Sequence, residues 1–454
     1  MNHKLHITEG CALIAQNKLK ITGTMLAVCS VFIVNSVSHA SSNSTIATSS
    51  LKIAAASSDT TTAPYGHETY AEPVDGDKGL IESLTGFKYN ETPFLQSLGV
   101  KVGGWVDIGF TGNPDNPSGS NGPVTFNRGP NEFRLHQVYG FIEREVNTNT
   151  STFSVGFRAD LLYGSDARYT FASNFDADEN FVGRILNGTS QHQLAFPQAY
   201  ANIYVPVGNG LTFQVGHFYT LIGYEVVPSA GNFFFSHAYT MQYGEPFTHT
   251  GALAIYPVNN NITVKGGVVT GWDAHFNQPA NFLGSISYTT DDERTTLTGS
   301  LISGSTETAF AAGTGTAKVD HNRTLYSLVL EHSFTDRLHY VLQHDHGNQE
   351  KTAFGRAAQW YGVNQYVFYD ILHNLAAGLR MEWFRDDDGV RVNGFTDNYI
   401  AVTGGLNYSP IAGFTIRPEV RYDRSTSDRK TDRAFNNGKD NDQILLSVSG
   451  IFRF

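Results

Sequence analysis

The C-terminal sequence Asp442–Phe454, DQILLSVSGIFRF, reads as a β-strand with two chemically different faces. Successive side chains of a strand point to opposite sides, so every second residue shares a face. One face carries apolar or small residues: Ile444, Leu446, Val448, Gly450, Phe452 and Phe454. The other face carries the polar residues Gln443, Ser447, Ser449 and Arg453, with Leu445 and Ile451 as the exceptions to the alternation.

Two structures fit this strand. It could be a half-buried strand of a soluble sheet, or the closing strand of a membrane β-barrel whose apolar side faces lipid. A final Phe-Arg-Phe resembles the signal that many outer-membrane barrels present to their assembly machinery. The rest of the chain has to distinguish the two.

The N-terminus favours export. Lys18 and Lys20 precede an apolar run at residues 25–34, and Ser38-His39-Ala40 places small residues where a signal peptidase cleaves. Residues 1–40 are therefore predicted to be a removed signal peptide. A transmembrane anchor is the alternative, but the apolar run is about half of the ~20 residues that span a bilayer.

Composition narrows the class of protein. Both cysteines, Cys11 and Cys29, lie in the predicted signal, so a disulfide-stapled fold is excluded. The net charge of −11 argues against a nucleic-acid partner. After residue 40 no apolar run is long enough for a membrane helix. A chain with 45 Gly, 31 Phe and 22 Tyr can still enter a membrane as a closed barrel of alternating strands.

Residues 41–99 are expected to form a flexible periplasmic segment before a barrel at residues 100–454. Residues 41–78 are a low-complexity stretch that cannot bury enough apolar surface to fold. Residues 92–99 predict a short helix, with Thr92 as N-cap, Pro93 at the first helical position and Gly99 after the end. Its apolar face is expected to pack under the barrel.

Sixteen candidate strands follow, an even number as in bacterial single-chain barrels. The predicted strands are 100–110, 132–145, 152–163, 194–205, 211–221, 249–257, 262–272, 281–290, 294–303, 323–333, 338–346, 358–371, 374–385, 397–408, 414–423 and 442–454.

The connections between these strands alternate in length. Short turns with turn-forming residues are 206–210, 259–261, 291–293 and 335–337. Long connections are 111–131, 164–193, 222–248, 304–322, 347–357 and 424–441. This alternation is typical of an antiparallel transmembrane barrel with tight periplasmic turns and extended outer loops.

Charged residues of both signs fall on the inward face of several predicted strands. The candidate pore-lining residues are Asp107, Arg134, Arg158, Asp160, Arg380, Glu382, Arg417, Glu419 and Arg421. Burying such groups without partners would cost several kcal/mol each, roughly. The pattern predicts a wet lumen, unless the charges neutralise one another across strands.

Several runs resemble the putative beta-barrel porin-2 family, the OmpL-like outer-membrane proteins. The runs lie at 104–110 (GWVDIGF), 157–168, 216–228, 243–251, 341–347 and 382–389, and the resemblance covers residues 100–454. The resemblance implies an outer-membrane, porin-like barrel. It brings no solute-binding residues, because the solutes of the family are poorly defined.

Two segments contain residues that bind metals in other proteins. His344 and His346 flank Asp345, but on a strand the two histidines share one face and the aspartate lies on the other. Residues 386–389 and 436–442 resemble fragments of calcium loops without the required bidentate Glu. We expect no metal and no other cofactor.

The long connection 222–248 is rich in aromatic residues and has only two charges, Glu225 and Glu245. Exposed on an outer loop, its rings would form a large apolar patch. It is therefore expected to fold into the lumen as a constriction, or to pack between barrels in an oligomer. The candidate constriction residues are Glu225, Phe233, Phe234, Phe235, Tyr239 and Glu245.

Together these patterns predict a sixteen-stranded outer-membrane porin, not an enzyme, that passes small solutes by diffusion. The expected partners are outer-membrane lipids, the barrel assembly machinery, small solutes and a possible homo-oligomer, with no nucleic acid. One alternative is a barrel enzyme of the protease or lipase type, with His344 and Asp345 at the outer rim. Another is a structural or adhesive barrel with a plugged lumen.

The first prediction concerns the mature N-terminus. Cleavage after Ala40 should give a protein that starts at Ser41 and runs in the outer-membrane fraction as a heat-modifiable band. N-terminal sequencing of the purified protein tests this. Retention of residues 1–40, or recovery as a soluble periplasmic protein, would contradict it.

Overall fold

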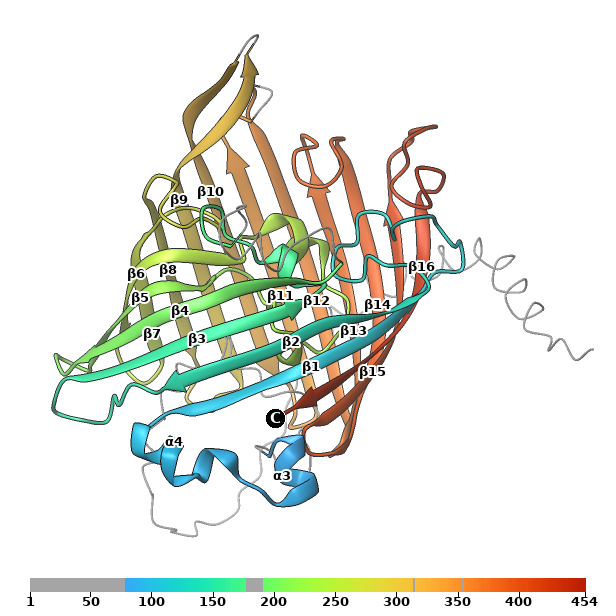
Figure 1. Cartoon of the computed structure of the whole chain (residues 1–454). Helices are drawn as coiled ribbons and strands as arrows, with labels where there is room; N and C mark the ends of the chain where they lie inside the picture. Colours follow the sequence, from blue (N-terminus) through green and yellow to red (C-terminus); the bar gives the residue numbers. More distant parts are fainter. Residues whose placement is uncertain (1–77, 177–190, 313–314, 353–354) are drawn as a thin grey trace, which may run out of the picture. The chain divides into compact units, whose positions relative to one another are not determined.

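The chain forms a closed barrel of sixteen antiparallel strands in which each strand pairs with its neighbours in the sequence (Figure 1). The computed structural model describes residues 78–176, 191–312, 315–352 and 355–454. The first and last strands, β1 (Lys101–Gly112) and β16 (Asp442–Arg453), pair from Trp105↔Arg453 to Gly112↔Leu446 and close the barrel. The predicted fold class and strand number are confirmed.

The strands match the predicted ranges within three residues, except at β9 and β10. The other strands are β2 (Glu132–Arg144), β3 (Ser154–Gly164), β4 (Gln193–Val205), β5 (Leu211–Tyr219), β6 (Thr248–Pro257), β7 (Ile262–Val269), β8 (Asn281–Thr289), β9 (Thr295–Ala312), β10 (Gly315–Ser333), β11 (Leu338–Gln349), β12 (Ala358–Leu372), β13 (Leu375–Asp386), β14 (Asp397–Ile411) and β15 (Phe414–Ser425). No described helix is long and apolar enough to cross a membrane.

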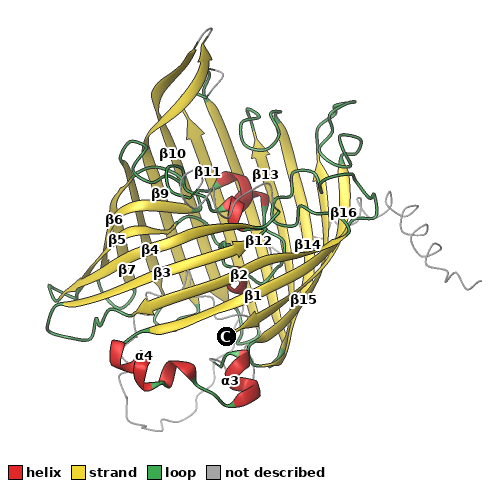
Figure 2. Ribbon diagram, in the orientation of Figure 1, coloured by secondary structure: helices red, strands yellow, loops and turns green. Residues whose placement is uncertain are grey.

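The prediction of a long loop at 304–322 was wrong. β9 and β10 continue as a paired hairpin up to Ala312↔Gly315, which rises beyond the neighbouring strands (Figures 1 and 2). The segment is rich in Thr, which favours strands, and antiparallel pairing satisfies its backbone without an apolar face. Residues 304–312 and 315–322 therefore form paired strands although they lack the alternation of apolar and polar residues that marks a membrane strand.

The two faces of the strands differ as the alternation predicts. On β15 the outward Val420 is exposed, whereas its inward neighbours Glu419 and Arg421 are buried. On β16 the outward Leu446 and Val448 are exposed and the inward polar residues are buried. The outside is thus an apolar belt suited to lipid, and the inside is polar.

The last residue completes the closure of the barrel. The Phe454 N–H donates to the Gly104 carbonyl at 2.9 Å, and the Gly104 N–H donates to the Phe454 carbonyl at 3.0 Å. A side chain at position 104 would overlap the Tyr139 carbonyl and the Phe454 ring, so the close approach requires glycine. Two residues before Gly104 on β1, the Val102 N–H donates to the Asn90 side-chain oxygen and the Val102 carbonyl accepts from the Asn90 side-chain amide, both at 2.9 Å.

Two short helices, α3 (Leu80–Thr85) and α4 (Pro93–Leu98), and the 3₁₀ turn η1 (Tyr89–Glu91) precede β1. α4 has the predicted boundaries: Thr92 is extended, Pro93 begins the helix, and Gly99 ends it with φ 63°. The expectation that its apolar face packs under the barrel was wrong, because Phe94 is 70% and Leu98 49% exposed. This segment is held by backbone and Asn90 contacts instead. Residues 1–77, with the predicted signal peptide, lie outside the described residues.

The second prediction follows from the closure. Deletion of Phe454 removes both hydrogen bonds to Gly104 and the terminal aromatic ring, so folded protein in the outer membrane should fall at least tenfold. As the control, residues 308–319 at the end of the β9–β10 hairpin are replaced by Asn-Gly, which leaves the closing strand intact. Quantitative blotting of outer-membrane fractions compares the two. Equal levels would show that Phe454 is not needed for closure.

Candidate functional site

Between β5 and β6 the chain turns into the barrel instead of forming an outer loop. This inner segment, residues 220–247, contains the 3₁₀ turn η3 (Ser229–Gly231) and the π-helical turn η4 (Thr240–Gly244), and most of its residues are buried and the rest half-buried. It is seen among the strands in Figure 1, and it contacts inward side chains of strands on the far wall. The fold therefore places an aromatic, almost uncharged segment across the interior.

On β15, Arg417 binds the inner segment through its carbonyl groups. Its Nη1 donates to the carbonyl oxygens of Ser229 and Asn232, both at 2.9 Å. Its Nη2 donates to Asp107 Oδ2 on β1 at 3.0 Å, and its Nε donates to Ser449 on β16 at 3.0 Å. One buried guanidinium thus joins three strands to the segment.

Two carboxylates on the same wall accept backbone N–H groups of the segment. Glu419 accepts from Phe235 at 2.9 Å and from Ser236 at 3.2 Å. Glu382 on β13 accepts from Tyr239 at 2.5 Å. Because a buried irregular backbone must find partners for its polar groups, these carboxylates do for the segment what a neighbouring strand does in a sheet.

Arg380 on β13 forms the central ion pair with Glu225 of the segment. Its Nη1 lies 2.7 Å from Glu225 Oε1 and donates to the Ser236 carbonyl at 2.6 Å. Glu225 Oε2 accepts from the Ala238 N–H at 2.9 Å and lies 3.0 Å from His237 Nδ1. Burial alone would raise the pKa of Glu225, but Arg380 and the hydrogen bond with His237 outweigh it and lower the pKa to about 2.

Arg421, the third buried arginine of this wall, completes the network. Its Nη1 donates to the His237 carbonyl at 2.6 Å, and its Nε donates to Asp423 Oδ1 at 2.7 Å. Its Nη2 lies 3.1 Å from Glu382 Oε1. Every buried arginine of this wall therefore has a carboxylate partner and also holds at least one carbonyl of the inner segment.

Glu245, the second carboxylate of the segment, has a different environment. Its Oε1 accepts from Gln343 Nε2 at 2.6 Å, and the same amide donates to Asp345 at 2.9 Å. Within the described residues no arginine or lysine forms an ion pair with it. Burial, and next the negative charge of Asp345, raise the pKa of Glu245 well above its usual range.

Apolar contacts fix the rest of the segment. Phe233 packs on Phe368 of β12 with ring centroids 4.8 Å apart, and Arg380 lies 5.0 Å from the centre of the Phe234 ring. The glycine at position 378 leaves room for the Phe233 ring, because a Cβ there would overlap it. The aromatic rings of the segment are thus buried against the wall.

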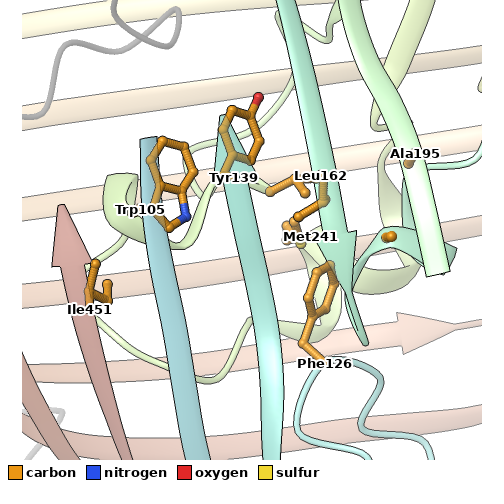
Figure 3. Close-up of a cluster of buried hydrophobic side chains, with 9 residues drawn as sticks. Trp105, Phe126, Tyr139, Leu162, Ala195, Met241 and Ile451 are labelled. Carbon is orange, nitrogen blue, oxygen red and sulfur yellow. The ribbon is translucent and has the colours of Figure 1, made fainter. Parts of the chain in front are cut away.

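Met241 of η4 lies in a cluster of buried apolar side chains with residues of β1 to β4 and β16 (Figure 3). Trp105 of β1 and Tyr139 of β2 stack there with ring centroids 4.0 Å apart. Ile451, an exception to the alternation on β16, belongs to the same cluster, and Leu445, the other exception, belongs to another. The inward apolar residues of the closing strand therefore contribute to the filled interior.

The structure separates the candidate pore-lining residues into two groups. Those in contact with the inner segment or with its anchors are Asp107, Arg380, Glu382, Arg417, Glu419 and Arg421. The remaining three are on other parts of the wall: Arg158 pairs with Asp160 at 2.8 Å on β3, and Arg134 donates to Glu132 at 2.6 Å on β2. The sequence predicted a wet lumen unless the inward charges neutralise one another. On the wall formed by β13 to β15 the inward charges do pair with one another and with the inner segment.

The sequence did not single out the neutral polar residues that hold the segment. Gln137 of β2 donates to the Val227 carbonyl at 2.8 Å and accepts from the Ser229 N–H at 3.0 Å. Gln343 of β11 accepts from the Tyr224 N–H at 3.2 Å. The sequence places both glutamines on the inward face of their strands. That position does not identify them as contacts of the inner segment, because inward amides are also expected in an open pore.

The candidate metal residues have other roles. Asp345 is buried and accepts from Ser327 at 2.6 Å, whereas His344 lies on the outer face beside Tyr326. Asp386 accepts the N–H groups of Val390, Arg391 and Val392 at 2.8–2.9 Å and so closes its own loop. In the part of the chain that the structure describes, no group of three or more potential ligands could hold a metal.

The closed barrel and its inward-folded segment define a porin-type channel of the outer membrane. The chain belongs to the family described as "Putative beta-barrel porin-2, OmpL-like", whose family model matches residues 99–454. The resemblance seen in the sequence is confirmed. No curated protein sequence matches the chain.

Solved structures of outer-membrane proteins share the fold. OprB of Pseudomonas putida has a TM-score of 0.53 at 9% identity, over 80% of this chain and 97% of its own. OmpT of Vibrio cholerae, in trimer form, has a TM-score of 0.52 at 9% identity, over 78% and 99%. The channel DcaP of Acinetobacter baumannii has a TM-score of 0.51 at 13% identity, over 78% and 97%. At these identities the likeness shows the fold alone.

The third prediction uses the two carboxylates of the inner segment as a matched pair. Glu225→Gln leaves the Arg380 charge buried without its closest carboxylate, since Glu382 lies 3.9 Å away, and should destabilise the folded barrel by about 3 kcal/mol at pH 7. Glu245→Gln replaces a carboxyl whose charged form is disfavoured by burial and by Asp345, so it should be neutral or stabilising. Thermal unfolding of purified protein in detergent, followed by heat modifiability, measures both.

The pH dependence gives a second readout. The stability from the lowered pKa of Glu225 is present above its usual value of 4.5 and is lost as the pH falls toward about 2. The penalty of Glu225→Gln should therefore shrink over that range. Equal effects of the two substitutions at pH 7 would show that the Glu225–Arg380 pair does not hold the segment.

Proposed function

We propose that the protein is a diffusion channel for small hydrophilic solutes whose bore is narrowed by the inner segment. The observation that carries this proposal is the anchoring of residues 220–247 to the far wall by buried, charge-paired side chains. A barrel of sixteen strands otherwise leaves an aqueous channel. The constriction is then formed by Glu225, Phe233, Phe234, Phe235, Tyr239 and Glu245, as the sequence predicted.

The remaining inward charges support a pore of weak ion preference. Arg134 and Arg158 are partly exposed on the wall of β2 and β3, where Glu132 and Glu143 lie beside them. Mixed signs at short range produce a local field without a large net charge, and such fields tune selectivity in charged pores. We expect a modest preference between K⁺ and Cl⁻.

The two alternatives are supported less well. His344 packs with Tyr326 on the outer face while Asp345 points inward, so the two do not form an acid–base couple at a rim. The family and the fold neighbours indicate a channel and not an enzyme. A plugged structural barrel would share every contact described above, and conductance distinguishes it.

Export and assembly complete the proposal. A signal peptide at residues 1–40 would direct the chain to the periplasm, and residues 41–99 would lie on the periplasmic side. The assembly machinery would recognise the closing strand and outer-membrane lipids would contact the apolar belt. Since one fold neighbour is described in a trimer form, we propose that the chain assembles as a homo-oligomer.

The fourth prediction tests the constriction. Replacing residues 232–235 with Gly-Ser-Gly-Ser removes three Phe rings and should at least double the single-channel conductance in planar bilayers. The matched control replaces residues 308–319 with Asn-Gly and should leave the conductance unchanged. An inner-segment variant that is folded but conducts as the wild type does would show that the segment does not limit the bore. Absence of conductance in the wild-type protein would favour the plugged barrel.

A further inference from the structure

Two arginines and a tryptophan meet beside the inner segment, and among the residues that the structure describes no carboxylate forms an ion pair with either arginine. Arg323 lies over the Trp272 ring at 4.9 Å from the centroid, and Arg391 lies at 5.4 Å from the same centroid. Arg391 also lies 4.8 Å from the centre of the Trp360 ring, and the two tryptophans are edge-to-face at 6.0 Å. We call Trp272, Arg323 and Arg391 the guanidinium–indole cluster.

The cluster is assembled from three separate parts of the barrel. Arg323 is on β10 at an inward position, two residues before the buried Leu325. Trp272 follows β7, and Arg391 lies in the loop after β13. The Arg391 Nε donates to the Tyr243 carbonyl of η4 at 2.5 Å, so the cluster adjoins the inner segment.

The cluster lies toward the outer side of the barrel. Arg323 pairs with Gln349, the last residue of β11, which leads into the connection to β12, and with Gly304 of β9, which continues into the rising β9–β10 hairpin. Long connections are the outer loops of such barrels. A solute entering from outside would meet the cluster on its way to the proposed constriction.

The charge balance separates these two arginines from those that anchor the segment. Arg380, Arg417 and Arg421 each have a carboxylate oxygen within 3.1 Å. Within the described residues, no carboxylate lies within ion-pair distance of Arg323 or Arg391.

The two nearest loop carboxylates are already occupied by the backbone. Asp273 accepts the N–H groups of Phe247 and Thr248 at 2.9 and 2.8 Å, and Asp386 accepts those of its own loop. Burial lowers the pKa of Arg391 to about 10, and the charges of Asp386 and Asp273 only partly oppose this. Arg391 remains charged at neutral pH, and no carboxylate of the described residues lies within ion-pair distance of it.

The cluster also has more hydrogen-bond donors than acceptors. The Arg323 Nε donates to Gln349 Oε1 at 2.9 Å, and the Arg391 Nε is used by Tyr243. The Trp272 Nε1–H is buried and has no acceptor among the described residues. An oxyanion is the ligand that supplies both the negative charge and the acceptor oxygens that this arrangement requires.

We propose that Trp272, Arg323 and Arg391 form a binding subsite for a small oxyanion, the carboxylate or phosphate group of an anionic solute, on the outer side of the constriction. The proposal rests on the proposed channel function and specifies a class of solute for it. The indole next to both guanidinium groups favours a solute with a flat apolar body beside its charged group, such as an aromatic carboxylate.

Equilibrium binding tests the subsite independently of transport. Benzoate, inorganic phosphate and neutral benzamide are titrated into purified protein in detergent, and tryptophan fluorescence and calorimetry report saturation. Wild-type protein should bind benzoate saturably and benzamide at least tenfold more weakly. Binding of phosphate as well would assign the recognition to the oxyanion alone, and its absence would assign it to the carboxylate with its ring.

Substitutions locate the site. Arg323→Gln removes one guanidinium without touching the inner segment and should weaken benzoate binding at least fivefold, and Arg323→Gln/Arg391→Gln should weaken it at least twentyfold. Arg391→Lys keeps the charge and should retain most of the binding. The control is Arg294→Gln, an exposed arginine that pairs with Asp336 at 2.7 Å in another part of the barrel, and it should bind as the wild type does.

The outcomes separate the two proposals. No saturable binding of either anion to the wild type, or equal binding by Arg323→Gln and the wild type, would overturn the subsite even if the protein conducts ions. Saturable binding that the arginine substitutions abolish supports the subsite even in a protein without conductance, and only the channel proposal would then fail. In conducting protein, the double variant should also shift the reversal potential in a KCl gradient toward cation preference.

Discussion

The interior of this barrel depends on the pairing of buried guanidinium and carboxylate groups across three strands and one irregular segment. Moving a single ion out of water costs several kcal/mol, roughly, and the attraction between two ions repays it only when the geometry is good and the remaining donors are used. Arg380 meets the first condition with Glu225 and most of the second, because its Nη1 and Nη2 donate to the Ser236 carbonyl, the Ser236 hydroxyl and the Thr403 hydroxyl, whereas its buried Nε has no hydrogen-bond acceptor among the described residues. Because the same groups satisfy the backbone of residues 220–247, the charges of the wall and the fold of the segment stabilise each other.

This reciprocity explains how a barrel can hold a buried segment with almost no regular hydrogen bonding. A strand would satisfy its backbone against neighbours, but the inner segment obtains partners from Glu419, Glu382 and Arg417. The aromatic rings then fill the space between these polar contacts and exclude water from them. The charged side chains fix the orientation of the segment through hydrogen bonds, and the aromatic rings stabilise it by burying apolar surface. Both contributions hold the segment in place.

The sequence was sufficient for the barrel and insufficient for its interior. Strand alternation, turn chemistry and loop-length parity reflect local rules, so β1 to β16 could be predicted closely, except where the Thr-rich hairpin of β9 and β10 extends beyond the neighbouring strands. The pairing of the inward charges depends on the position of the inner segment, which is distant in the sequence. Arg417, for example, binds the carbonyl of Ser229, and the two residues are 188 positions apart. Leu445 and Ile451 did carry a signal: two apolar residues at inward positions of the closing strand indicate a partner inside the barrel.

The contact between Asn90 and Val102 bears on how the barrel avoids pairing with other chains. Where β16 ends, the first residues of β1 would present free backbone donors and acceptors, and an open strand edge is a template for intermolecular sheet formation. A single carboxamide, with one acceptor and one donor, reproduces the two bonds that a peptide unit of a neighbouring strand would make. The short helical segment before the barrel therefore covers this part of the sheet edge, and because Asn90 and Val102 are only 12 residues apart, the chain supplies this cover from its own neighbouring sequence.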